Sequence, residues 1–128
     1  MTDFAFDEWV EKAEEDFRAA RALDPSDVPK VVCFLSQQCA EKYLKAALVR
    51  QETEVPRIHN LVVLNDMVAE GDGRFERLND SINVLNPFSV AARYPGTDTT
   101  PEDAREAFQA ARKMRAQIRK LLNLHPKR

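Results

Sequence analysis

The segment CFLSQQCAEKYLKAALVR, residues 33–50, indicates a long helix at the centre of an α-helical protein. Apolar residues recur at helical spacing around much of its circumference, with Leu35, Cys39 and Tyr43 on one stripe and Leu44 beside them. A helix that is apolar around so much of its girth is typical of the middle of a bundle. The polar residues that interrupt this surface either face water or line a ligand site, and the rest of the chain bears on that choice.

Four further segments have the periodicity of amphipathic helices, and none has the alternation of a strand. Turn-forming residues (Pro, Asp, Ser and Gly) separate them, and Asn60 and Thr100 are suitable N-caps for the third and last helices. The predicted helices, including the central one, cover about 4–22, 30–51, 59–70, 75–85 and 101–122. The pattern predicts an all-α protein, an antiparallel up-and-down bundle of four main helices plus one short helix, in one domain over residues 1–128.

Composition excludes several classes of protein. The chain has 128 residues and a formal net charge of −2, which argues against binding nucleic acid by bulk positive charge alone. No apolar run is long enough to span a membrane, and the acidic N-terminus is unlike a secretory signal. Cys33 and Cys39 fall on different faces of one helix, so we expect two free, buried thiols and a cytoplasmic location.

The residue patterns of common enzymes and metal proteins are missing. A di-iron bundle needs Glu-x-x-His pairs, and neither His59 nor His125 has a Glu three residues before it. There is no CxxC pair, no glycine-rich phosphate loop and no nucleophile elbow. We therefore expect no metal and no cofactor, and the sequence favours a protein that is not an enzyme without deciding the point.

A polar stripe runs along the central helix. Gln38, Lys42 and Lys45 lie at i, i+4 and i+7, and Glu41 stands one turn before Lys45 in the favourable orientation for an ion pair. One interpretation is an exposed face with a helix-stabilising ion pair. The other is that Gln38, Lys42 and Lys45 line a cleft and contact a phosphate or a base.

Two other positions carry side chains suited to a nucleotide. His59 lies at the entrance to the third helix, where unpaired backbone N–H groups bind anions readily. Arg93 and Tyr94 stand before a Pro-Gly turn, and they offer a planar cation for phosphate and a ring for stacking. Structural alternatives remain open, with His59 capping or packing on the bundle end and Tyr94 plugging it.

Together these segments resemble the HEPN domain of the small, stand-alone prokaryotic type. The resemblance rests on an aromatic-x-x-Gln-Gln-x-x-Glu-Lys-x-x-Lys helix, a Pro-x-x-His-x-Leu entrance and an Arg-Tyr-Pro turn. The matching residues are Phe34, Gln37, Gln38, Glu41, Lys42, Lys45, Pro56, His59, Leu61, Arg93, Tyr94 and Pro95. The resemblance implies a helical bundle that forms a homodimer, is often encoded beside a minimal nucleotidyltransferase, and in many such pairs belongs to a toxin–antitoxin module.

Some members of that family are metal-independent ribonucleases with an Arg-x4-6-His motif, and others bind nucleotides. The one match to the motif here is Arg119 with His125, but Lys120 stands where those ribonucleases usually have Asn, Asp or His. Three hypotheses follow. The first is a non-catalytic module that binds a nucleotide, RNA or a nucleotidyltransferase, and the second is a metal-independent endoribonuclease with His59, Arg93, Arg119 or His125 in its site. The third is a dimerising scaffold without a ligand.

Overall fold

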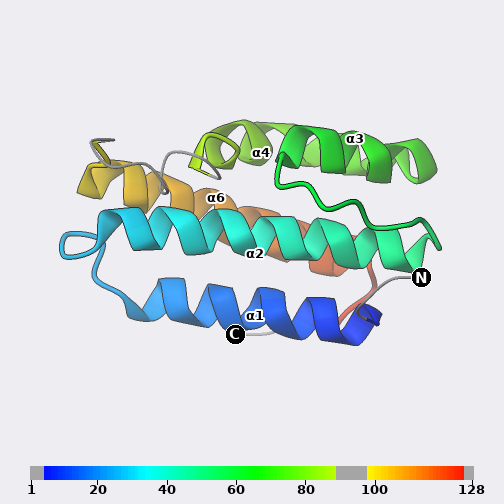
Figure 1. The fold of residues 1–128 in the computed structure, drawn as a ribbon, viewed down its shortest axis with the longest axis horizontal. Coiled ribbons are helices and arrows are strands. Elements are labelled where there is room, and N and C mark those ends of the chain that lie inside the picture. Colours follow the sequence, from blue (N-terminus) through cyan, green and yellow to red (C-terminus); the bar gives the residue numbers. More distant parts are fainter. Residues whose placement is uncertain (1–4, 89–97, 126–128) are drawn as a thin grey trace.

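The computed structural model describes residues 5–88 and 98–125. Over these residues the chain forms five α-helices and one 3-10 helix and no strand, so the predicted all-α bundle is confirmed (Figure 1). The elements are α1 (Phe6–Ala22), α2 (Pro29–Arg50), α3 (Leu61–Gly71), η1 (Gly73–Leu78), α4 (Asn79–Leu85) and α6 (Pro101–Leu121).

Both predicted N-caps start their helices. The Asn60 side chain accepts hydrogen bonds from the backbone N–H groups of Val62 and Val63, at 2.9 and 3.2 Å. Thr100 and Asp103 form a reciprocal capping box, in which each side chain bonds the other's backbone N–H at 3.0 Å. These contacts satisfy donors that the first turn of a helix leaves unpaired.

The segment predicted as one helix over 75–85 is divided in the structure. It begins as the 3-10 helix η1 and becomes the α-helix α4 only at Asn79. Within η1 the Phe75 carbonyl accepts a hydrogen bond of 3.0 Å from the Asn65 amide of α3. The predicted Arg93, Tyr94 and the following turn lie outside the described residues.

The centre of the bundle is α2, as its broad apolar surface predicts. It packs against α1, α3, α4 and α6, and its Tyr43, Leu44 and Leu48 side chains are fully buried. Cys33 and Cys39 are free and buried, as expected. Burial, with a smaller contribution from Asp103, raises the pKa of Cys33 to about 12, so its thiol stays protonated at neutral pH.

The connector between α2 and α3 doubles back along α2 (Figure 1). At the C-terminal end of α2 the Gln51 amide donates to the Val68 carbonyl at 3.0 Å. In the N-terminal half of α2 the Gln37 amide donates to the His59 carbonyl at 3.2 Å. α3 therefore runs in the same direction as α2, so this pair departs from the antiparallel order predicted for the bundle, because the connector returns along α2 before α3 begins. This return path places His59, the residue before the cap of α3, over the middle of α2.

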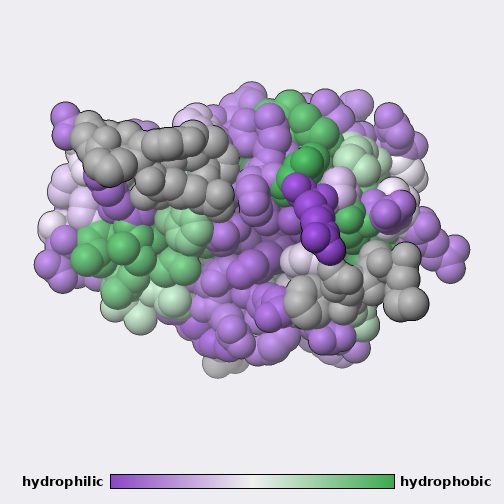
Figure 2. Space-filling model, viewed as in Figure 1, coloured by the Kyte–Doolittle hydropathy of each residue, from purple (hydrophilic) through white to green (hydrophobic). Residues whose placement is uncertain are grey.

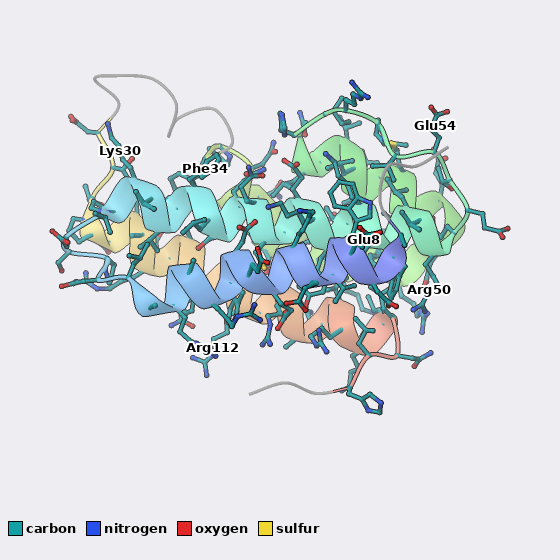
Figure 3. The ribbon with its side chains drawn as sticks, turned by 60° about the horizontal axis from the view of Figure 1, so that its bottom comes forward. Glu8, Lys30, Phe34, Arg50, Glu54 and Arg112 are labelled. Carbon is teal, nitrogen blue, oxygen red and sulfur yellow. The ribbon has the colours of Figure 1, made fainter. Side chains whose placement is uncertain are left out.

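The surface over the middle of α2 is polar. Figure 2 shows hydrophilic residues across the centre of this face, with hydrophobic patches towards its two ends. Exposed large apolar residues include Val31 at the start of α2 and Val62 and Val63 on α3. Charged side chains such as Lys30 and Arg112 project outward from the bundle (Figure 3). No described helix combines the length and the hydropathy that crossing a membrane requires.

Candidate functional site

The polar stripe of α2 is mostly buried between helices, which corrects the interpretation of a simple solvated face. We call this region the α2 seam, defined by the six residues Gln37, Gln38, Glu41, Lys42, Lys45 and His59. Gln37, Glu41 and Lys45 are buried, Gln38 and Lys42 are partly exposed, and only His59 is exposed. The seam joins α2 to α1 on one side and to the entrance of α3 on the other.

The carboxylate of Glu41 is the hub of the seam. Its side chain is 5% exposed and accepts three hydrogen bonds. Oε1 is 2.9 Å from His59 Nδ1 and 3.3 Å from Gln37 Nε2, and Oε2 is 3.1 Å from Lys45 Nζ. A buried carboxylate requires partners of this kind, because an unpaired buried charge is strongly destabilising.

His59 is held by this hub with its other nitrogen directed away from it. Since an ionised carboxylate can only accept, Nδ1 of His59 carries the proton that it donates to Glu41. In the neutral tautomer that this bond favours, the lone pair is on Nε2, and half of the side chain is exposed to solvent. A His oriented in this way can accept a proton or a hydrogen bond from a bound molecule.

The two lysines of the seam are paired within the chain. Lys45 is 7% exposed, bonds Glu41 and lies over the ring of Trp9, 5.6 Å from its centroid. Lys42 pairs with Asp16 of α1 at 2.5 Å. Each positive charge is therefore matched by a carboxylate, and the seam does not present free positive charge.

Two glutamines of the seam, Gln37 and Gln38, have side-chain oxygens that lack a hydrogen bond within the described parts of the chain. Both oxygens are buried. Unsatisfied buried acceptors are uncommon, since each forfeits the hydrogen bonds it made to water. Gln38 lies about one turn before Glu41 on α2.

A second buried polar cluster, which contains Arg119, lies between α1, α2 and α6. We call it the Glu14 cluster; its members are Glu14, Tyr43, Arg115 and Arg119. Arg115 donates two hydrogen bonds of 2.7 Å to the Glu14 carboxylate, and the Tyr43 hydroxyl donates to the same group. The Arg119 guanidinium bonds the Tyr43 oxygen at 2.9 Å.

These partners set the ionisation of Glu14. Burial alone would raise its pKa, but hydrogen bonds from Arg115 and Tyr43 and the charges of both arginines outweigh that effect and lower the pKa to about 2. Burial and the hydrogen bond to Glu14 raise the pKa of Tyr43. Glu14 is thus ionised at all physiological pH values, and the cluster ties α1, α2 and α6 together.

The structure places Arg119 and His125 in contact, but not as a pair of reactive side chains. Arg119 is 8% exposed, and it binds the backbone carbonyl of His125 at 2.6 and 3.2 Å. Its remaining nitrogen is bound within the Glu14 cluster. The guanidinium of Arg119 therefore uses its donors in hydrogen bonds within the protein, and this arrangement does not favour Arg119 and His125 as a catalytic pair.

Sequence reasoning missed the Glu14 cluster and the connection of Glu41 to His59. The signal for the cluster was present, because Glu14 falls on the stripe with Phe17 and Arg115 on the stripe with Ala111, so both charges occupy apolar positions. The contact of Glu41 with His59 depends on the path of the connector, which no local pattern encodes. Within the described residues, no group of three or more His, Cys, Asp or Glu side chains could hold a metal.

Comparison with known proteins identifies the bundle. The family model of the HEPN domain matches residues 6–121. The chain is similar to TT1696 from Thermus thermophilus, with a TM-score of 0.76 and 25% identity over 90% of this chain and 96% of that one. It also has the fold of ST0689, described as an archaeal HEPN homologue, with a TM-score of 0.71 and 24% identity over 92% of this chain and 98% of that one.

The comparison with curated proteins gave no match. The family model nevertheless covers nearly the whole described bundle, from the first residue of α1 to the last residue of α6. The chain therefore belongs to the HEPN domain family.

Proposed function

We propose that this protein is a homodimeric HEPN module that binds a nucleotide unit, free or within RNA, at the α2 seam. The observation that carries the proposal is the Glu41–His59 pair, in which a buried carboxylate orients a half-exposed imidazole. His59 Nε2 would bond a phosphate or a base edge. The amide N–H groups of the partly exposed Gln38 would donate to a base carbonyl or a phosphate oxygen.

The paired lysines give this proposal a distinctive property. Because Lys42 and Lys45 already bind Asp16 and Glu41, binding would release few counterions and depend only weakly on salt. Lys45 would act indirectly, by holding the Glu41 carboxylate in place. Lys42, which is partly exposed, would lie at the edge of the bound nucleotide. Arg93 and Tyr94 remain predicted contacts, and they lie outside the described residues.

The test is binding of ATP and GTP by calorimetry and of a labelled single-stranded RNA by fluorescence anisotropy, all in EDTA. We expect His59→Gln to weaken binding about tenfold, through the loss of one hydrogen bond. His125→Gln is the matched control, because it removes the chain's other histidine, which is also exposed. The wild-type protein failing to bind any of the three at millimolar concentration would refute the proposal, as would equal affinity of His59→Gln.

The same dyad favours a second function, metal-independent RNA cleavage. His59 Nε2 could take the proton of a ribose 2′-hydroxyl, whose oxygen then attacks the adjacent phosphorus, forms a cyclic phosphate and displaces the 5′-oxygen, which takes up a proton. Arg93, the predicted phosphate ligand, would stabilise the charge that develops on the phosphorus. Cleavage in EDTA by the wild type but not by His59→Gln would establish this activity, and equal cleavage by His59→Gln and the wild type would exclude it.

The family resemblance also supports a minimal nucleotidyltransferase as the partner, in a toxin–antitoxin type pair. The test is to read the neighbouring gene and, if it encodes a minimal nucleotidyltransferase, to express this chain with and without that protein. A toxin–antitoxin role predicts growth arrest by one protein alone and relief by the pair, together with co-purification. Unaffected growth and no co-purification would argue against it.

A further inference from the structure

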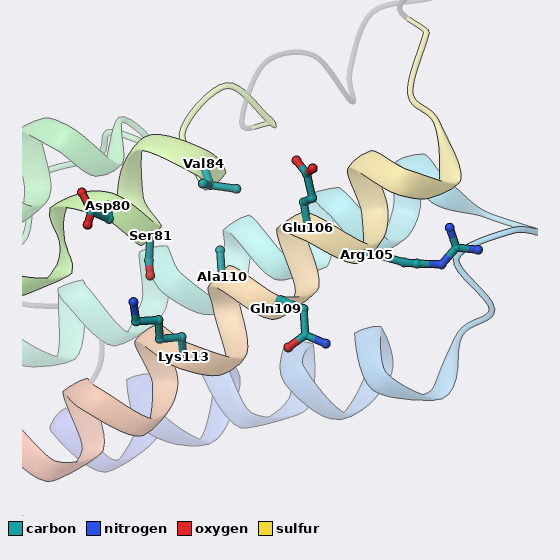
Figure 4. A pocket seen from close by; sticks show the side chains of 8 residues that line it. All are labelled: Asp80, Ser81, Val84, Arg105, Glu106, Gln109, Ala110 and Lys113. Carbon is teal, nitrogen blue, oxygen red and sulfur yellow. The ribbon is translucent and has the colours of Figure 1, made fainter.

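An open groove of about 450 Å³ lies between α4 and α6 (Figure 4). Its middle is formed by Val84, which is 40% exposed, and by the small side chain of Ala110 on the facing helix, which is 9% exposed. The full lining is Asp80, Ser81, Val84, Arg105, Glu106, Gln109, Ala110 and Lys113. This groove is separate from the α2 seam, since it contains no residue of α2.

The groove carries charges of both signs, distributed between its two ends. Figure 4 shows Asp80 and Lys113 at one end and Glu106 and Arg105 at the other, with Ala110 between them. Among the described residues neither Glu106 nor Lys113 has an ion-pair partner, and Arg105 has only a 3.2 Å hydrogen bond to Ser26. With an acidic side chain at each end, the groove is unsuited to a polyanion such as RNA.

This pattern complements itself when it is turned end for end. Glu106, Ala110 and Lys113 lie at i, i+4 and i+7 on one face of α6. At about 1.5 Å of rise per residue, Glu106 lies about 6 Å to one side of Ala110 and Lys113 about 4.5 Å to the other. Consider a two-fold axis that passes Ala110 at a right angle to α6. It would place Glu106 of one copy and Lys113 of the other at nearly the same height, about 1.5 Å apart as measured along the helix axis.

We infer that the α4–α6 groove is the interface for a second copy of this chain, with the two α6 helices crossing antiparallel at Ala110. The small side chain lets the two helices approach closely, and Val84 of each copy packs against the other. Each Glu106 then pairs with the partner copy's lysine, so that two symmetric ion pairs flank an apolar centre. The inference rests on the homodimer of the proposed function and names its surface.

Charge reversal tests this arrangement by sedimentation equilibrium on the full chain. Glu106→Lys and Lys113→Glu should each weaken the dimer about tenfold, because each places like charges opposite one another twice. The double variant Glu106→Lys with Lys113→Glu should restore the wild-type association. Arg112→Glu is the matched control, since Arg112 neighbours Lys113 in sequence but projects away from the bundle (Figure 3).

Circular dichroism of each variant separates loss of association from loss of fold. A dimeric wild type with two weakened single variants and a restored double variant supports the inference. A dimer that all variants retain unchanged overturns this interface while leaving dimerisation intact. A monomeric wild type overturns both the interface and the homodimer, whereas ligand binding at the α2 seam is measured independently of either result.

Discussion

Replacement of Glu14 by Gln should produce one of the largest losses of stability that a single isosteric change can cause in this bundle. The substitution removes the charge that accepts two 2.7 Å hydrogen bonds from Arg115, and it leaves that buried guanidinium without a counter-charge. The pKa of Glu14 falls from 4.5 to about 2 on folding, and at about 1.36 kcal/mol per unit this corresponds to roughly 3 kcal/mol. Breaking a buried ion pair by removing one partner costs about 3–5 kcal/mol in other proteins.

The assay is urea denaturation of Glu14→Gln beside Glu15→Gln, the same chemical change at the next position, which is exposed. We expect Glu14→Gln to lose roughly 3 kcal/mol at pH 7 and Glu15→Gln less than about 0.5 kcal/mol. Because the folded pKa lies below the unfolded one, the stabilisation by Glu14 is complete above pH 4.5 and is lost as the pH falls towards 2. The gap between wild type and Glu14→Gln should thus shrink by more than half at pH 3. Equal stability of the two variants at pH 7, or a gap that does not change with pH, would refute this reasoning.

Three further predictions concern the helix ends and the thiols. Thr100→Ala should lower the free energy of unfolding by about 1 kcal/mol, measured by thermal denaturation, because it removes the capping box of α6; an unchanged melting temperature would contradict it. Gly71→Ala should be less stable than Gly73→Ala by about 1 kcal/mol, because a Cβ at 71 lies 2.8 Å from the Gln51 side chain that binds the Val68 carbonyl, whereas nothing lies within 4 Å at 73; the opposite order would count against the packing. The two buried cysteines should react with a thiol reagent only at the rate of unfolding, and rapid labelling of the native protein would show that they are accessible.

The sequence predicted the parts of this fold that depend on local periodicity. The apolar stripes of α1, α2 and α6, the caps Asn60 and Thr100, and the central position of α2 all follow from residue spacing. The division of the fourth helix was missed because the apolar spacing of residues 75–85 is helical across both of its parts. The contact of the Asn65 amide with the Phe75 carbonyl, ten residues away, also leaves no local signal.

The candidate site was only partly predictable for the same reason. Residue type and spacing singled out Gln38, Lys42, Lys45 and His59. The structure brings Lys45 and His59 to the same carboxylate, Glu41, and pairs Lys42 with Asp16 of α1. The burial of Gln37, Glu41 and Lys45 could not be read from α2 alone, since a polar stripe has the same spacing whether water or another helix covers it. The return path of residues 51–60 decides which residue meets Glu41, and no periodicity encodes a path through an irregular connector.

The most direct test of the central claim is the nitrogen NMR spectrum of the two histidine rings during titration with ATP or a short RNA. The account predicts that Nδ1 of His59 stays protonated by its bond to Glu41, while the Nε2 resonance of His59 shifts on binding and His125 does not change. Glu41→Gln should abolish that selectivity by releasing the ring. A ligand that binds without moving the His59 Nε2 resonance, or that moves only His125, would contradict the assignment of the α2 seam as the binding site.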